Sequence, residues 1–149
     1  MKKNKISKNW IIKQHRDPFF KQSKIQGYRS RSAFKLIEMN KKFKFLKKGT
    51  YLLDLGCSPG GWAQVATKII SKGEILSVDI KSMDNIHNVN FLKGDLLDNE
   101  ICEKISNYFE KKFDVVISDI AANTTGNRNL DSFRTGELCL TAMDLAKKV

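Results

Sequence analysis

A glycine-rich segment, residues 54–62 (DLGCSPGGW), constrains the fold more than any other stretch of the chain. A short apolar run, residues 51–53, precedes it, and a run with helical character, residues 63–70, follows it. A strand, a glycine-rich turn and a helix in succession open the nucleotide-type site of an open α/β sheet. Glycines let a ligand approach the backbone because they carry no Cβ, and the new helix offers unpaired N–H groups. The segment predicts a ligand-binding turn; the alternative is a turn whose glycines only satisfy backbone geometry.

The spacing of the glycines distinguishes two classes of ligand. A dinucleotide-binding turn reads G-x-G-x-x-G, and a P-loop needs G-x-x-x-x-G-K-[ST]. This chain has D-x-G-x-x-x-G-G, and no lysine follows the glycines. The pattern favours a nucleoside ligand without phosphates. S-adenosylmethionine (SAM) is the obvious candidate, because its amino acid end can lie along the turn.

Three further apolar runs, residues 74–80, 89–95 and 113–119, read as strands, and an aspartate lies at or near the end of each. Ligands bind at the carboxyl ends of the strands in such sheets. Asp79 lies about twenty residues after the glycines, where a carboxylate commonly binds ribose hydroxyls. We expect Asp95 to accept a hydrogen bond from an adenine amino group, and Asp119 to lie at the same rim. The alternative for each is an exposed acid at a strand end.

The alternation of strands and helices predicts an α/β fold with a mostly parallel sheet and right-handed crossovers. The run 113–119 is continuously apolar, which predicts burial on both faces. With no strand after it, this run would form an exposed apolar edge, which favours aggregation. We therefore expect the chain to be a shortened version of a longer fold, lacking its last strands.

Capping residues predict where the helices begin. Asp17 before Pro18 predicts a short helix that ends at Gly27. Ser32 is predicted to cap the next helix, and Asp98 and Asp131 to begin two later ones. The expected exit of the second helix is packed by two aromatic residues, Phe43 and Phe45.

Positive charge is concentrated in the N-terminal third. The net charge is +11, yet residues 1–48 hold sixteen Lys and Arg against two acids. Such a segment predicts contact with nucleic acid phosphates, and the cluster at Arg29 and Arg31 fits this better than a solvated lysine-rich tail does. We expect residues 1–31 to form a basic arm with a short helix, and residues 32–149 to form the ligand-binding domain.

The three cysteines, Cys57, Cys102 and Cys139, form no C-x-x-C pair, so the sequence indicates neither a zinc site nor a disulfide framework. No apolar run approaches the length of a membrane span, and the basic start lacks the apolar core of a signal peptide. We expect a cytoplasmic protein that binds no metal and no membrane.

Three segments together resemble the RrmJ/FtsJ family of SAM-dependent RNA ribose 2′-O-methyltransferases. They are residues 27–36 (GYRSRSAFKL), residues 54–62 and residues 118–123 (SDIAAN). The resemblance runs from about Trp10 to Val149. It is strongest to the bacterial or organellar type, which methylates a uridine of large-subunit ribosomal RNA. It implies a Rossmann-like methyltransferase fold that uses SAM and acts on ribosomal RNA or the large ribosomal subunit, and we expect a monomer.

The resemblance also implies roles for individual residues. The implied SAM contacts are Gly60, Trp62, Asp79, Asp95 and Asp119. The family's catalytic group is Lys-Asp-Lys-Glu, in which Lys35 matches the first lysine and Asp119 the aspartate. The second lysine, taken as the proton acceptor, and the glutamate lie on later elements of the family and match no position in this chain.

Two alternatives remain beside this enzyme. One is a shortened relative that binds SAM, RNA or both without turnover. The other is an enzyme of the same chemistry whose substrate is transfer RNA, since related enzymes share these motifs.

Overall fold

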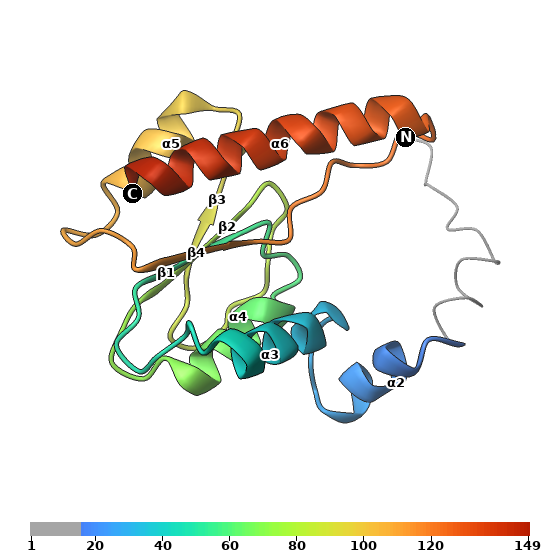
Figure 1. Ribbon diagram of the computed structural model, residues 1–149, viewed down its shortest axis with the longest axis vertical. Helices are drawn as coiled ribbons and strands as arrows, with labels where there is room; N and C mark the ends of the chain where they lie inside the picture. The colour runs from blue at the N-terminus through green and yellow to red at the C-terminus, as the bar shows by residue number, and fades with distance from the viewer. Residues whose placement is uncertain (1–15) are drawn as a thin grey trace.

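The structure, a computed structural model, describes residues 16–149. Within that range four parallel strands form one sheet in the order β3-β2-β1-β4, with helices on both faces (Figure 1). The strands are β1 Leu52–Leu55, β2 Ile75–Asp79, β3 Asn90–Lys93 and β4 Val115–Ser118. The helices are α2 Pro18–Ile25, α3 Ser32–Phe43, α4 Gly61–Ile69, α5 Asn99–Ser106 and α6 Arg128–Lys148. The predicted α/β fold with a parallel sheet is confirmed, whereas residues 1–15 of the basic arm expected over residues 1–31 lie outside the described residues.

Two cores lie on opposite faces of the sheet because side chains alternate along a strand. Leu52 of β1 packs with α3 and α4, among them Leu36 and Trp62. Leu53 and Leu55 point to the other face, where α5 and α6 cover them. All of β1 is buried, which fits its central place between β2 and β4.

The register of the strands brings their carboxyl ends to one rim. Leu55, the last residue of β1, is level with Val78 of β2 and with Ser118 of β4. Asp79 is paired with Lys93, the last residue of β3. The segments that follow the four strands therefore start side by side, and they contain the aspartates expected at a ligand site.

The start of the second helix differs slightly from the prediction. Asp17 caps α2 as expected, and its carboxylate accepts hydrogen bonds from two backbone N–H groups of the first turn. Ser32, in contrast, is the first residue of α3 and not its cap. Arg31 occupies the cap position without a side-chain hydrogen bond to the helix, and the hydroxyl of Ser32 is hydrogen-bonded to that of Ser30 at 2.6 Å.

The last helix begins three residues before the predicted Asp131. Asn127 is the cap, and its side chain accepts hydrogen bonds from the first turn of α6. Asn and Asp are about equally good caps, so the sequence alone did not decide between them. Asp131 instead accepts two hydrogen bonds from Thr125 and thereby orders the loop before the helix.

Two predictions of burial are wrong. Phe43 is 65% exposed, while Phe45 packs against the core as predicted. In β4 only Ile117 is buried, and the neighbouring valines are half-buried. Within residues 16–149 β4 pairs with β1 alone, so it is an edge strand whose outer side is open.

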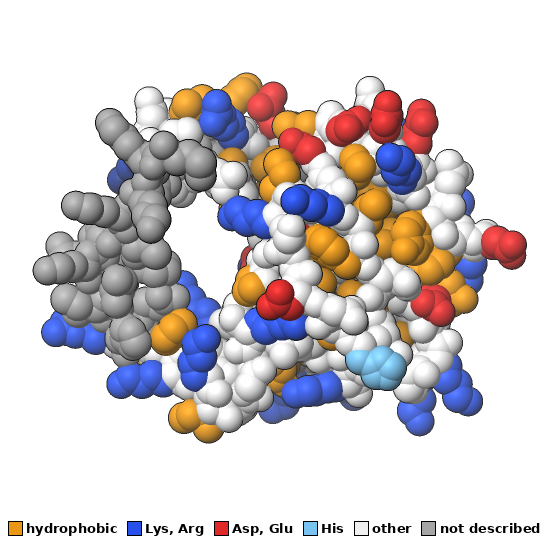
Figure 2. Space-filling model, turned by 180° about the vertical axis from the view of Figure 1, so that it is seen from behind, with side chains coloured by type: hydrophobic (Ala, Val, Ile, Leu, Met, Phe, Trp, Pro, Cys, Tyr) orange, Lys and Arg blue, Asp and Glu red, His pale blue; other side chains and the backbone are white. Residues whose placement is uncertain are grey.

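Acidic and basic side chains are unevenly distributed over the surface. In the view of Figure 2, acidic side chains gather at the upper right, on the side of α5, while Lys and Arg side chains line the lower edge and also occur near the top. Within the described residues, α2 and α3 belong to the basic N-terminal third, and α3 packs on the same face of the sheet as α4.

Candidate active site at the carboxyl rim

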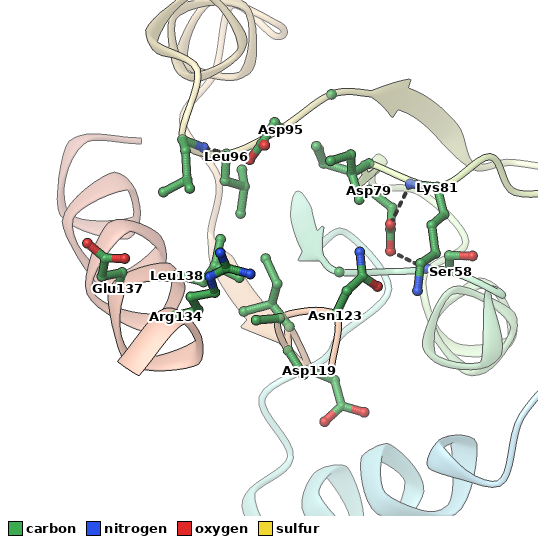
Figure 3. A pocket seen from close by; sticks show the side chains of 18 residues that line it. Ser58, Asp79, Lys81, Asp95, Leu96, Asp119, Asn123, Arg134, Glu137 and Leu138 are labelled. Atoms are coloured by element: carbon green, nitrogen blue, oxygen red, sulfur yellow. Dashed lines mark hydrogen bonds between the residues drawn. The ribbon is translucent and has the colours of Figure 1, made fainter. Parts of the chain in front are cut away.

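A cavity of about 590 Å³ lies at the carboxyl rim of the sheet. Its volume falls within the usual range for a small-molecule site. The walls come from the segments after all four strands and from the first half of α6 (Figure 3). Three of the predicted site residues line it: Asp79, Asp95 and Asp119.

The glycine-rich turn forms one wall, and its shape leaves no room for side chains. Gly56 has φ +78°, and a Cβ there would lie 2.8 Å from the Cα of Ile120. Gly60 has φ +107°, and a Cβ there would lie 2.7 Å from Ile86. Both the left-handed backbone and the close neighbours require glycine. The packing of the turn against the protein's own residues accounts for both glycines, and Gly56 also lines the cavity, so the ligand-binding role of the turn stays a prediction.

Asp79 is held in a fixed orientation at the end of β2. One carboxylate oxygen accepts a hydrogen bond from the backbone N–H of Ser58 and the other from that of Lys81, each at 2.8 Å (Figure 3). A carboxylate offers about four acceptor positions, so Asp79 keeps capacity for two donors from a ligand. Adjacent hydroxyl groups, such as those of a ribose, are donors of that kind.

Asp95 lies across the cavity from the glycine-rich turn. One of its oxygens accepts a hydrogen bond from the backbone N–H of Leu97 at 3.0 Å. Its half-buried carboxylate sits beside Leu96, which is only 4% exposed. An acceptor next to an apolar wall suits a flat heterocycle that carries an amino group.

Lys35 and Asp119 meet although 84 residues separate them. The Nζ of Lys35 donates to Oδ1 of Asp119 at 2.7 Å, and both side chains are partly exposed. The carboxylate of Asp119 turns from the cavity toward α3, which carries Lys35 (Figure 3). The ammonium group also lies 5.5 Å from the centre of the Trp62 ring. This contact places a cation and a carboxylate at the mouth of the cavity.

Gly60 and Trp62, also predicted site residues, do not line the cavity. Trp62 is 4% exposed, and its ring nitrogen donates to the backbone oxygen of Ser32 at 2.8 Å. Gly60 lies beneath Ile86 and Met83. The structure therefore places both residues behind the wall that Gly56 and Ser58 present.

Asp54 is a buried carboxyl group directly beneath this wall. It is 1% exposed, and the hydroxyl of Ser77 donates to it at 3.4 Å. Burial raises the pKa of Asp54 from 3.8 to about 7, and the nearby charges of Asp119 and Asp79 act in the same direction. Burial, followed by the charge of Asp54, also raises the pKa of the Cys57 thiol well above its ordinary value, so that thiol is no nucleophile at neutral pH.

Helix α6 contributes residues that sequence reasoning missed. Arg134, Glu137 and Leu138 line the cavity opposite Lys81 and Asp79 (Figure 3). Arg134 and Leu138 are four residues apart and therefore share one face of the helix, which is visible in the sequence. This spacing does not identify them as site residues unless it is known that the helix passes over the rim.

Neither a metal-binding cluster nor a membrane-spanning helix occurs in the part of the chain that the structure describes. Among residues 16–149, no group of three or more His, Cys, Asp and Glu side chains is arranged to hold a metal ion. In the same part of the chain, no helix combines the length and the apolar character needed to cross a membrane.

Comparison with known proteins adds to this geometry. The profile of one family, FtsJ-like methyltransferase, matches residues 28–149. A protein of Pelagibacter ubique named ribosomal RNA large subunit methyltransferase E is 50% identical over the whole chain, which covers 73% of that relative. A protein of the same name from Acinetobacter baylyi is 43% identical over 99% of the chain and 69% of the relative.

A solved structure agrees with these relatives. The crystal structure of a protein described as a ribosomal RNA methyltransferase from Plasmodium falciparum superposes with a TM-score of 0.69 at 38% identity. The match covers 78% of this chain and 69% of that one.

Proposed function

Because the chain belongs to the FtsJ-like methyltransferase family, we propose that it transfers the methyl group of SAM to a ribose 2′-hydroxyl of large-subunit ribosomal RNA, on a uridine. The names of the relatives support ribosomal RNA as the substrate. We further propose that it acts as a monomer in the cytoplasm and engages the RNA as part of the large ribosomal subunit.

The residues at the rim fit SAM. Gly56 of the glycine-rich turn lines the cavity, and a Cβ there would press on Ile120, which lines the same cavity. In this assignment Asp79 binds the ribose hydroxyls, Asp95 accepts from the adenine amino group, and Asp119 lies at the reacting end. Gly60 and Trp62 act from behind the wall, Gly60 by allowing the turn and Trp62 by packing against Lys35. When bound, SAM supplies an electrophilic methyl group on a sulfonium centre.

The observation that carries the proposal is the contact between Lys35 and Asp119. A hydroxyl is a poor nucleophile, and negative charge develops on its oxygen as the proton leaves. A fixed ammonium group at the mouth of the cavity stabilises that charge. Asp119 orients the ammonium group, so we assign Lys35 as a cation and donor. None of residues 16–149 is assigned as the proton acceptor that the family resemblance implies, a second lysine, so in this proposal the proton of the hydroxyl passes to solvent water.

The basic side of the sheet is the place for the RNA. Lys35 lies on α3, whose last turn carries two further lysines, Lys41 and Lys42. Phosphate groups bound there would lead the target ribose to Lys35.

The test is methyl transfer from labelled SAM to undermethylated large ribosomal subunits. We expect transfer by the unsubstituted protein and a loss of roughly 100-fold or more in kcat for Lys35→Met and for Asp119→Asn. Lys72→Met, an exposed lysine after α4, serves as the matched control and should keep its activity.

Three outcomes would separate the alternatives. Binding of SAM with no transfer to any RNA would indicate a module that binds without turnover. Label that maps to transfer RNA would correct the substrate. Transfer that neither substitution lowers would refute the assignment of Lys35 and Asp119.

A further inference from the structure

Arg29 lies between α2 and α3, and its side chain is directed at the protein's own backbone. Its Nη1 donates to the carbonyl oxygens of Pro59 at 3.3 Å and Asp84 at 2.7 Å. Its Nη2 donates to the carbonyl oxygen of Asn85 at 2.9 Å. One guanidinium group therefore bridges the glycine-rich turn and the loop between β2 and β3. Its charge is met by carbonyl dipoles, in contrast to Arg31, which forms an ion pair with Asp17.

The two bridged loops carry adjacent parts of the candidate cofactor site, joined by the hydrogen bond from the Ser58 N–H to Asp79. Pro59 immediately precedes Gly60, and the second loop starts directly after Asp79. The three segments are in contact at Gly60, where a Cβ would lie 2.8 Å from Met83 and 3.1 Å from Nη1 of Arg29. A change in the position of Arg29 is therefore transmitted to both loops.

The backbone around Arg29 is also held in place, by hydrogen bonds to α4. The backbone N–H of Arg29 donates to Oε1 of Gln64 on α4 at 2.7 Å. Nε2 of Gln64 donates back to the carbonyl oxygen of Gly27 at 3.1 Å. The backbone of Arg29 is therefore anchored before its side chain reaches the loops, which makes the guanidinium group a rigid bridge.

A lysine cannot make the same bridge. Guanidinium is planar and carries five N–H donors spread over three nitrogens, whereas lysine has one nitrogen at the end of a flexible stem. A single ammonium group can reach Asp84 or Pro59, but it cannot at the same time occupy the place from which Nη2 reaches Asn85.

We propose that Arg29 is a positioning residue that sets the spacing between the glycine-rich turn and the loop after β2, and through it the affinity for SAM. The role rests on the proposed function, because it assumes that the cavity holds SAM. Arg29 was predicted from sequence to contact RNA phosphates, and the bonds to Pro59, Asp84 and Asn85 assign its charge to the protein itself.

The test is calorimetric titration of SAM into the Arg29→Lys protein, with Arg31→Lys as the matched control. We expect the Kd for SAM to rise roughly tenfold in R29K, because one or two charge-assisted hydrogen bonds are lost. R31K should keep its affinity for SAM. In turnover assays R29K should show a raised KM for SAM with a nearly unchanged kcat at saturating SAM.

Two further readouts separate positioning from a loss of folding. Millimolar methylguanidinium should restore SAM affinity to Arg29→Ala, which a generally destabilised protein would not show. Amide hydrogen exchange at Gly60 and Val89, whose N–H groups are bonded within the two loops, should quicken in R29K even without SAM. If the R29K protein does not unfold cooperatively, the Arg29→Gln protein is tested in its place, with the same expected rise in the Kd for SAM.

The proposal is wrong if R29K binds SAM as the unsubstituted protein does. A raised KM for RNA that depends steeply on salt, with unchanged SAM affinity, would make Arg29 a phosphate contact. Failure of the unsubstituted protein to bind SAM would refute the proposed function instead, and hydrogen exchange would still report whether Arg29 orders the two loops.

Discussion

Replacing Asp54 by Asn should stabilise the folded protein most at neutral and alkaline pH, and progressively less as the pH falls toward 4, where the effect should nearly vanish. Asp54 is 1% exposed in the middle of the sheet, and its pKa is raised from 3.8 to about 7 because burial disfavours the charged form. Asn has nearly the same shape, is neutral at every pH in question, and keeps an oxygen that accepts from Ser77.

The sign follows from the protons bound in each state. Below pH 3.8 both states carry a protonated Asp54, so the carboxyl group costs nothing. Between pH 3.8 and about 7 the unfolded chain is ionised and the folded protein is still protonated, so stability falls as pH rises. Above pH 7 both are ionised and the cost is constant. The difference between 3.8 and about 7, at about 1.4 kcal/mol for each pH unit, sets that cost at about 4 kcal/mol.

The assay is urea unfolding of both proteins at several values of pH between 4 and 8.5. The fluorescence of the buried Trp62 reports the loss of the core. The difference in unfolding free energy between D54N and the unsubstituted protein removes the contributions of all other titrating groups. We expect it to grow with pH and to level off above pH 7, at no more than about 4 kcal/mol.

A difference that stays constant over this range would refute the reasoning, because it would mean that Asp54 ionises alike in both states. A difference that grows toward acid pH would reverse the sign and place an unrecognised cation beside Asp54. Equal m-values in the two proteins serve as the control that the unfolded states are comparable.

Three other substitutions test the site and the fold. Gly56→Ala should lower stability by about 2 kcal/mol or more in urea unfolding and weaken SAM binding in calorimetry, because φ is +78° and the new methyl group meets Ile120. Leu145→Ala should cost about 2 to 5 kcal/mol in urea unfolding, since this residue of α6 is 3% exposed in the core. Arg134→Ala should leave stability within about 0.5 kcal/mol and lower SAM affinity or turnover, because the side chain is exposed and lines the cavity; unchanged binding and turnover would remove Arg134 from the site.

The sequence predicted the elements whose signals are local. Apolar runs ending in aspartate identified the strands, and Asp17 before Pro18 identified a helix start, because both depend on residues within one turn or one strand. The start of α6 was misplaced, since Asn127 and Asp131 are both competent caps. The burial of β4 was overestimated because an apolar run does not tell whether a strand is central or at an edge.

The parts of the site that could not be predicted depend on contacts between distant residues. Without a structure, nothing in the residues around Arg29 separates an arginine that binds carbonyl groups 30 and 55 residues away from one that binds phosphate. The same limit applies to Arg134, whose place over the rim depends on the direction of α6. The pairing of Lys35 with Asp119 could be proposed beforehand only through the resemblance to a family.

The aspartates at the rim show how one sequence pattern supplies several chemical roles. Asp54 and Asp79 both follow apolar residues. Asp54 lies inside a central strand and is buried away from water, while Asp79 accepts hydrogen bonds from two backbone N–H groups and remains accessible. The carboxylate of Asp119 instead accepts a hydrogen bond from Lys35, a side chain from the basic side of the sheet. That ion pair joins α3 to the segment after β4. In the proposed function, α3 faces the RNA and the segment after β4 faces SAM. Methyl transfer requires both substrates to meet at one place, so the proposal assigns the catalytic groups to this ion pair.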